Sequence, residues 1–224
     1  MDGPKSTDGL AKATEAHAPA VYRLLRALAS VGVFAEQADG RFASTTPAEY
    51  LRSDVPGSIR AWAMFIGRPH TWSAWAYLPE SIRTDEPAFP KLHGTSSWEY
   101  RASRPEESAI FEAAMTGLSA GAAEAIVRSY DFSGIEAFAD VGGGQGELLA
   151  AVSATNPDLR GILFDQPHVV AGAKALLERS GVADRGEVVG GSFFEAVPEG
   201  ADAYLFKSVD HNWDDGAATE ILRK

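Results

Sequence analysis

The chain has 224 residues, of which 45% are hydrophobic and 23% charged, a composition typical of a folded globular protein rather than a disordered or fibrous one. It contains no cysteine, which excludes disulfides, thiolate metal sites and a cysteine nucleophile, and we expect no metal site. Its net charge of −11 argues against a nucleic-acid partner. No uninterrupted apolar run of about 18 residues and no apolar signal segment occurs, so we expect no membrane association and a cytoplasmic location.

Residues 1–60 show the pattern of a small helical module with a hairpin. Apolar residues recur at helical spacing at Val21, Leu24, Leu25, Leu28 and Val31. Residues 33–42, with an Asp39-Gly40 turn, predict a β-hairpin, so the module is interpreted as a winged helix. A regulator that binds DNA through this module is an alternative, but its seven basic and seven acidic residues leave no basic footprint.

Residues 61–130 are rich in aromatic side chains and mostly helical in pattern, with a loop expected at residues 86–90. Trp62, Trp72 and Trp75 fall within fourteen residues, and aromatic faces of this kind suit a pocket for a planar organic substrate. Packing in the core is the alternative, and we favour it for any single tryptophan because large aromatic residues are usually buried for packing alone.

Apolar runs alternate with helical segments from residue 137 onward. Strands are expected at residues 137–141, 161–164, 187–189 and 203–209, with helices at 147–154, up to 177 and from about 214. Alternation of this kind predicts a doubly wound parallel sheet covered on both faces.

The first of these strands leads directly into the glycine loop Gly142–Gly146, where such sheets bind nucleotide-like ligands. Glu147 at the start of the following helix is a poor neighbour for a pyrophosphate. Asp140 before the loop can hold an ammonium group, and Asp165 at the end of the second strand can accept hydrogen bonds from ribose hydroxyls. Together, the glycine loop, Asp140 and Asp165 suit a ligand in which an amino acid is joined to a nucleoside. A mononucleotide or flavin site and a purely structural turn remain as alternatives.

Several separate motifs resemble the S-adenosylmethionine-dependent small-molecule O-methyltransferases of the plant caffeic-acid type and their bacterial natural-product relatives. They are the N-terminal module, residues 111–115, the acidic glycine loop 140–146, residues 164–170 and residues 206–213. The resemblance implies an α/β fold, with a Rossmann-like class I methyltransferase domain preceded by an α-helical winged-helix dimerisation module. It divides the chain into a dimerisation module (1–80), a helical linker with the substrate pocket (81–130) and a partial cofactor-binding domain (131–224).

The resemblance also assigns residues to the site, with S-adenosyl-L-methionine as cofactor and a hydroxylated small molecule as partner. The cofactor would be bound by Asp140, Gly142, Gly144, Gly146, Asp165, Ser192, Phe193 and Lys207, with Ser119 near its carboxylate. Many family members have Asp where this chain has Ser192, which weakens one contact. The substrate would lie against Trp72, Phe111 and Met115.

His211 matches the general base of the family and follows the fourth strand, where ligands of such sheets lie. The alternative is a histidine that caps a helix or faces solvent. His17, His70, His93 and His168 lack such a setting and are interpreted as structural. Asn212 replaces a frequent Asp beside the base.

Only the first four of the family's seven strands, ordered 3-2-1-4-5-7-6, are expected in this chain. We therefore expect a chain truncated at both ends, with the fourth strand at an exposed edge. The resemblance implies methylation of a hydroxyl group on an aromatic or polyketide-like small molecule, and a homodimer for the full-length family. The alternatives are a fragment that binds the cofactor but is inactive, and a relative that catalyses hydroxylation or decarboxylation.

Overall fold

The computed structural model describes residues 3–55 and 57–224. The chain forms two compact units, Met1–Ala63 and Met64–Lys224. The sequence placed the first boundary at residue 80, but the helices that follow Met64 pack with the second unit rather than with the first.

The first unit contains the helices and the hairpin that the sequence predicts. Helices α1 (Thr7–Ala13) and α2 (Ala18–Ser30) precede strands β1 (Phe34–Glu36) and β2 (Phe42–Ser44), which pair antiparallel. The short helix α3 (Thr46–Glu49) follows. Helix α2 ends where Gly32 takes a positive φ of 79°, a conformation that glycine adopts at no steric cost. The hairpin is confirmed, and the winged-helix interpretation stays a prediction.

The apolar stripe of α2 is only partly covered within this unit. Leu25 is buried, whereas Leu24 is 59% exposed and Val31, which caps the helix, is 72% exposed. Leu24 and Val31 are thus exposed to solvent. They are candidates for the dimer contact that is expected in this unit from the sequence.

The second unit begins with a helical segment. Its helices are α4 (Arg60–Ile66, which crosses the boundary), α5 (Pro69–Ala76), α6 (Leu78–Thr84), α7 (Ala88–His93), α8 (Ser97–Ala102) and α9 (Pro105–Ser129). The loop expected at 86–90 is wrong from Ala88 onward, because α7 begins there with Pro87 as its N-cap, and Pro90 falls in the first turn. A proline there removes no intrahelical hydrogen bond, so the helix tolerates it.

Helix α9 is, within residues 3–55 and 57–224, the one helix long and apolar enough to cross a bilayer by length and composition, with a mean hydropathy of 1.3 in its most apolar window. Glu112 and Glu124 interrupt its apolar residues. The helix packs closely against α10 and carries buried residues toward the parallel sheet, so one of its faces belongs to the core of this unit.

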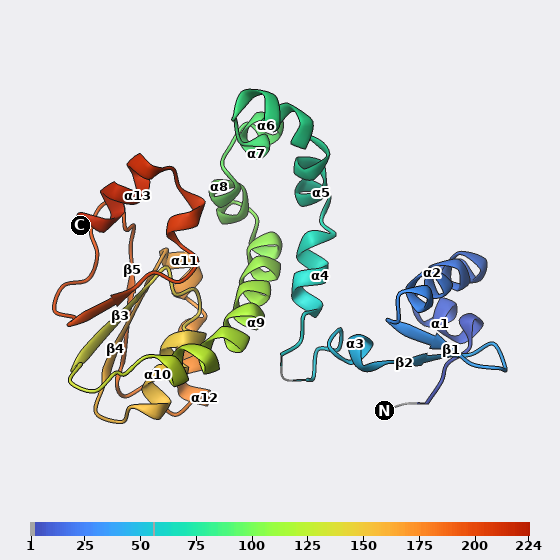
Figure 1. Ribbon diagram of the computed structural model, residues 1–224, viewed down its shortest axis with the longest axis horizontal. Helices are drawn as coiled ribbons and strands as arrows, with labels where there is room; N and C mark the ends of the chain where they lie inside the picture. Colours follow the sequence, from blue (N-terminus) through green and yellow to red (C-terminus); the bar gives the residue numbers. More distant parts are fainter. Residues whose placement is uncertain (1–2, 56) are drawn as a thin grey trace. The chain divides into compact units, whose positions relative to one another are not determined.

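A four-stranded sheet of parallel strands forms the rest of the second unit (Figure 1). Its strands are β3 (Ala137–Val141), β4 (Arg160–Asp165), β5 (Gly186–Gly190) and β6 (Ala203–Leu205), in the order β5-β4-β3-β6. The parallel sheet is confirmed, and the fourth strand lies at its edge as expected. The strand expected to reach residue 209 ends at Leu205, which pairs with Asp140 near the end of β3, and Ser208 then leaves the extended conformation with a φ of 59°.

The strands alternate their side chains between two packed layers. Phe138 and Leu163 join α9, α10 (Glu147–Thr155) and α12 (Ala173–Arg179) in the larger core cluster. Ala139 and Ile162 face the other side, where side chains from residues 189–206 pack on them. Helix α11 (Pro167–Val170) follows β4, and η1 (Asp210–Asn212) and α13 (Asp215–Leu222) follow β6. The carboxyl ends of β3, β4 and β6 therefore meet at one edge, where ligands of open α/β sheets bind.

Candidate cofactor and acceptor site

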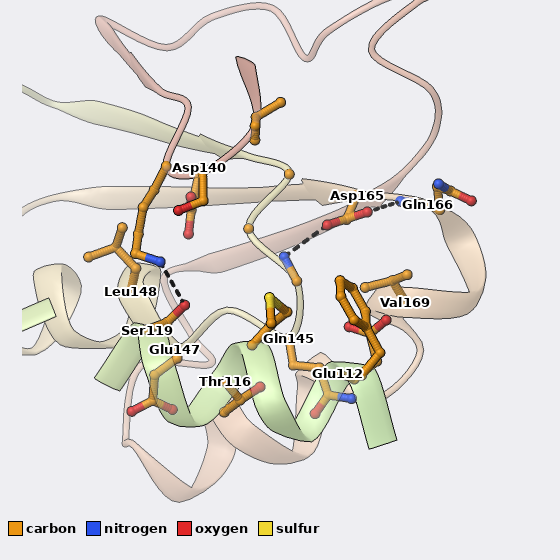
Figure 2. Close-up of a pocket in the computed structure, with 18 of the residues that line it drawn as sticks. Glu112, Thr116, Ser119, Asp140, Gln145, Glu147, Leu148, Asp165, Gln166 and Val169 are labelled. Carbon is orange, nitrogen blue, oxygen red and sulfur yellow. Dashed lines mark hydrogen bonds between the residues drawn. The ribbon is translucent and has the colours of Figure 1, made fainter. Parts of the chain in front are cut away.

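A pocket opens at this edge of the sheet, between the strand ends and helices α8 and α9 (Figure 2). Its lining includes the glycine loop, the ends of β3 and β4, one face of α9 and the segment after β6. The predicted residues that line it are Phe111, Met115, Ser119, Asp140, Gly142, Gly144, Asp165, Phe193 and Lys207. Nine of the predicted side chains or backbone positions are thus brought together from segments up to 96 residues apart.

The glycine loop packs so closely against its neighbours that two of its positions have no room for a side chain. A Cβ on Gly142, whose φ is +70°, would lie 2.5 Å from a methyl carbon of Val209. A Cβ on Gly143 would lie 2.6 Å from both the Asp140 carboxyl group and a methyl carbon of Leu163. Without side chains, the loop backbone follows the pocket wall closely and leaves its surface open to a ligand.

The carboxyl group of Asp140 lies just beneath this loop and is almost completely buried, at 1% exposure. Among the described residues its Oδ2 atom has no hydrogen-bond partner. Burial and the nearby charge of Asp165 raise the pKa of Asp140 to about 7, although Lys207 acts in the opposite direction. A buried carboxylate that lacks a donor is unfavourable unless a ligand supplies one, and an ammonium group is the natural donor.

Asp165 ends β4 and is held against the same loop. Its Oδ2 accepts a hydrogen bond of 2.9 Å from the backbone N–H of Gly144, and its Oδ1 accepts one of 2.7 Å from that of Gln166, as Figure 2 shows. Burial raises the pKa of this carboxyl group, while the two backbone donors lower it. The side chain is therefore fixed beside the loop, and each oxygen retains a free lone pair for a hydroxyl donor.

Lys207 reaches across the pocket from the segment after β6. Its Nζ donates a hydrogen bond of 3.1 Å to the hydroxyl of Ser119 on α9 (Figure 2). The resemblance placed Lys207 near the cofactor and Ser119 near its carboxylate, and these two residues are in direct contact. Their pairing ties α9 to the sheet on the side opposite Asp165.

The other end of the pocket is aromatic. Trp98 on α8 stacks on Trp213, with ring centroids 6.2 Å apart and planes inclined by 22°. Phe193 meets Trp213 edge to face at 6.0 Å, and Phe111 meets Trp98 in the same way at 5.9 Å. With Met115 beside them, these rings form a wall suited to a flat, apolar molecule.

Glu112 and Arg101 are charged residues of this pocket that were not predicted as site residues from the sequence. Glu112 is 9% exposed, and its burial, with a contribution from the charge of Asp165, raises its pKa to about 7. Arg101 is 6% exposed, and burial lowers its pKa to about 10. A signal for Glu112 existed, because Phe111, Glu112, Met115, Thr116 and Ser119 recur at the spacing of one helix face.

Four predicted residues do not line the pocket. Gly146, the last residue of the glycine loop, is the N-cap of α10 with a φ of 89°. Ser192 instead accepts a hydrogen bond from the backbone N–H of Phe194 at 3.3 Å. Trp72 is 66% exposed on α5. His70 and Ala74 of this helix face the adjacent helices, and Trp72, two positions from each of them, lies on a different face. Trp75 is also exposed, so the core interpretation is wrong for both tryptophans.

His211 is the fourth of these residues. It lies in η1 with an exposed side chain, whereas its neighbours Asn212 and Trp213 line the pocket. The side chain of His211 therefore does not share the direction of the two residues that follow it. His168, which was interpreted as structural, does line the pocket at the start of α11.

The fold and this site define an α/β domain with a glycine loop at the carboxyl ends of its parallel strands, next to an aromatic pocket. The sequence model of the O-methyltransferase domain matches residues 75–224, about two thirds of the chain. The protein belongs to this O-methyltransferase family.

Individual relatives agree with this assignment. Phenazine O-methyltransferase PhzM of Lysobacter antibioticus is 43% identical over 99% of this chain, which spans 65% of that relative's length. A crystal structure of LaPhzM superposes with a TM-score of 0.94 at 43% identity, over 99% of this chain and 67% of that one. NcsB1 from neocarzinostatin biosynthesis, solved with S-adenosylmethionine and 2-hydroxy-5-methyl naphthoic acid, superposes with a TM-score of 0.83 at 36% identity, over 99% and 68%.

Proposed function

We propose that this chain binds S-adenosyl-L-methionine and contributes to methyl transfer onto a hydroxyl group of an aromatic or polyketide-like small molecule. The observation that carries the proposal is the glycine loop Gly142–Gly146 with the buried carboxyl groups of Asp140 and Asp165 on either side of it. A cofactor complex of the relative NcsB1 supports the same ligand.

The charges of the pocket fit this cofactor. Glu112, Asp140, Glu147 and Asp165 bring four carboxyl groups to the lining, and burial raises the pKa of each of them. When bound, S-adenosylmethionine supplies a methyl group on a positively charged sulfur. Asp140 would accept from its ammonium group, Asp165 from the ribose hydroxyls, and the Lys207–Ser119 pair would hold its carboxylate.

The chain's part in the reaction is to orient the acceptor and to receive a proton. The rings of Trp98, Phe111 and Trp213 would fix a planar acceptor with its hydroxyl toward the cofactor end. We propose His211 as the general base, because it follows β6 at the ligand-binding edge of the sheet and precedes the lining residue Asn212. Glu112 is the second candidate, since it faces the pocket with a pKa near neutrality.

The larger protein context is also part of the proposal. We propose a homodimer that forms through the N-terminal unit, supported by the exposed Leu24 and Val31 of α2. We further propose a cytoplasmic location, with which the absence of cysteine from the sequence is compatible. A partner with nucleic acid is not proposed, because the chain's net charge of −11 opposes it.

Titration calorimetry with S-adenosylmethionine and S-adenosylhomocysteine tests the binding step. We expect saturable binding of both, lost in an Asp140→Asn, Asp165→Asn double variant and kept in the matched exposed variant Asp158→Asn. No heat of binding at high micromolar ligand would overturn the proposal. Incorporation of a labelled methyl group into a hydroxylated naphthoate then separates an active chain from a fragment that only binds the cofactor, and product analysis separates methylation from hydroxylation or decarboxylation.

A further inference from the structure

Arg101 is a buried cation that has no anionic partner among the described residues. It is 6% exposed, and within residues 3–55 and 57–224 Glu112 acts on its charge without forming an ion pair with it. Its one hydrogen bond in that part of the chain is long, at 3.5 Å from Nη2 to the hydroxyl of Ser97. A guanidinium with five donors is costly to bury in this state, and the lowered pKa of about 10 reflects that cost.

The guanidinium lies over the aromatic wall of the pocket. Its central carbon is 3.9 Å from the ring centroid of Phe111 and 4.6 Å from that of Trp98. Both rings line the same pocket as the glycine loop. The side chain also borders a smaller cavity beside His70, but neither of these two rings lines that cavity. The charge is therefore positioned beside the place where a planar acceptor would stack.

The two basic side chains Lys207 and Arg101 lie at different ends of the pocket. Lys207 is already paired with Ser119 next to the glycine loop, whereas Arg101 is the cation of the aromatic end. Glu112 lies near enough to raise the pKa of Arg101 without forming an ion pair with it. Its own pKa of about 7 leaves a substantial protonated fraction at neutral pH, and a protonated carboxyl group can donate a hydrogen bond to an anionic ligand.

From this geometry we propose that Arg101 binds a carboxylate on the aromatic ring of the acceptor, so that the acceptor is a hydroxylated aromatic acid. The inference rests on the proposed function for the identity of the reaction, but the binding itself can be measured without turnover. A planar carboxylate matches the guanidinium fork with two parallel hydrogen bonds, while the attached ring lies against Trp98 and Phe111.

The experiment compares two probes of nearly the same size and shape, 3-hydroxy-2-naphthoate and 3-hydroxy-2-naphthamide, of which the amide has no charge and one acceptor oxygen fewer. Binding to the chain saturated with S-adenosylhomocysteine is followed by calorimetry and by quenching of tryptophan fluorescence. We expect the wild-type protein to bind the acid at least tenfold more tightly than the amide. Arg101→Gln should remove most of that preference and change amide binding less than twofold, and Arg101→Lys should retain part of it.

Arg104→Gln is the matched control. This arginine follows the same helix and also lies over an aromatic ring, that of Tyr100 at 3.8 Å, but it is exposed and outside the pocket lining. We expect it to leave both affinities unchanged.

Three results would overturn the inference: equal binding of acid and amide to the wild type, no binding of the acid, or an equal loss for both probes in Arg101→Gln. The last would indicate that Arg101 only packs the aromatic wall. If Arg101→Gln does not fold, the inference is still tested by the affinities of the wild-type protein for the acid and the amide, and by those of Arg101→Lys. Failure of S-adenosylhomocysteine to bind would instead refute the proposed function, so the two failures are distinguishable.

Discussion

The backbone N–H of Gly144 donates a hydrogen bond of 2.9 Å to the carboxylate of Asp165, a residue 21 positions further along the chain. This contact joins the loop after β3 to the end of β4, the two neighbouring strands at the centre of the parallel sheet. Asp165 thus fixes the conformation of the loop and also faces the pocket that the loop lines. One side chain would position the cofactor cradle and contact the cofactor.

We expect Asp165→Asn to weaken S-adenosylhomocysteine binding at least tenfold, about 1.4 kcal/mol, because an amide has one acceptor oxygen where the carboxylate has two. The amide NH2 group would then face one of the two backbone donors, Gly144 or Gln166, and could not accept a hydrogen bond from a ribose hydroxyl. Calorimetry at fixed salt measures the change. Asp158→Asn, on an exposed turn, should bind as the wild type does, and an equally small effect of both substitutions would contradict the role assigned to Asp165.

Gly142→Ala should abolish cofactor binding and lower the free energy of unfolding by roughly 2 to 5 kcal/mol. The alanine would adopt a φ of +70° and place its Cβ 2.5 Å from a methyl carbon of Val209, which adds backbone strain to overpacking. Urea unfolding and calorimetry measure the two effects.

Gly121→Ala is the control for this change. Gly121 lies inside α9 with open space where a Cβ would be added, so alanine should raise the free energy of unfolding by up to about 1 kcal/mol through helix propensity. If Gly142→Ala were as harmless as Gly121→Ala, the loop would not have the tight geometry described above.

The pKa of Asp140 predicts how stability changes with pH. Because burial raises this pKa from 3.8 to about 7, the folded protein keeps a proton that the unfolded chain has already released between these values. The free energy of unfolding should therefore decrease as pH rises from about 4 to about 7. Glu112, whose pKa is raised from 4.5 to about 7, adds to the same decrease.

Asp140→Asn should flatten this decrease, because the amide does not titrate. Urea unfolding at pH 5, 6 and 7 compares the variant with the wild type and with Asp158→Asn, which should keep the wild-type slope. A slope that is identical in Asp140→Asn would show that the Asp140 carboxyl group is ionised throughout this range.

The cofactor end of the site could be predicted from the sequence because its signal is local. Asp140, the glycines and Asp165 follow their strands directly, and the ends of neighbouring parallel strands must meet at one edge of a sheet. Chain order alone therefore brought these residues together, and the structure places them around one pocket.

The residues at the acceptor end of the pocket could not all be predicted, because their position depends on the direction of each side chain, which the sequence does not show. Trp72 has the right residue type but lies on the exposed face of α5, whereas Trp98 and Trp213, 115 positions apart, stack on one another. Arg101 belongs to a helix of six residues, too short for a periodic pattern to show which face is buried.

The assignment of the base is tested by two substitutions in a methyl-transfer assay with hydroxylated naphthoates. His211→Gln should lower kcat by about 10² to 10⁴, the usual contribution of a general base, and leave S-adenosylhomocysteine binding unchanged. Glu112→Gln should lower kcat less than tenfold, because glutamine keeps the size and polarity of the side chain and the proton would go to His211. His17→Gln, an exposed histidine at the start of α2, is the control and should have full activity. The opposite ranking, with Glu112→Gln inactive and His211→Gln active, would assign the base to α9 and would agree with the direct access of Glu112 to the pocket.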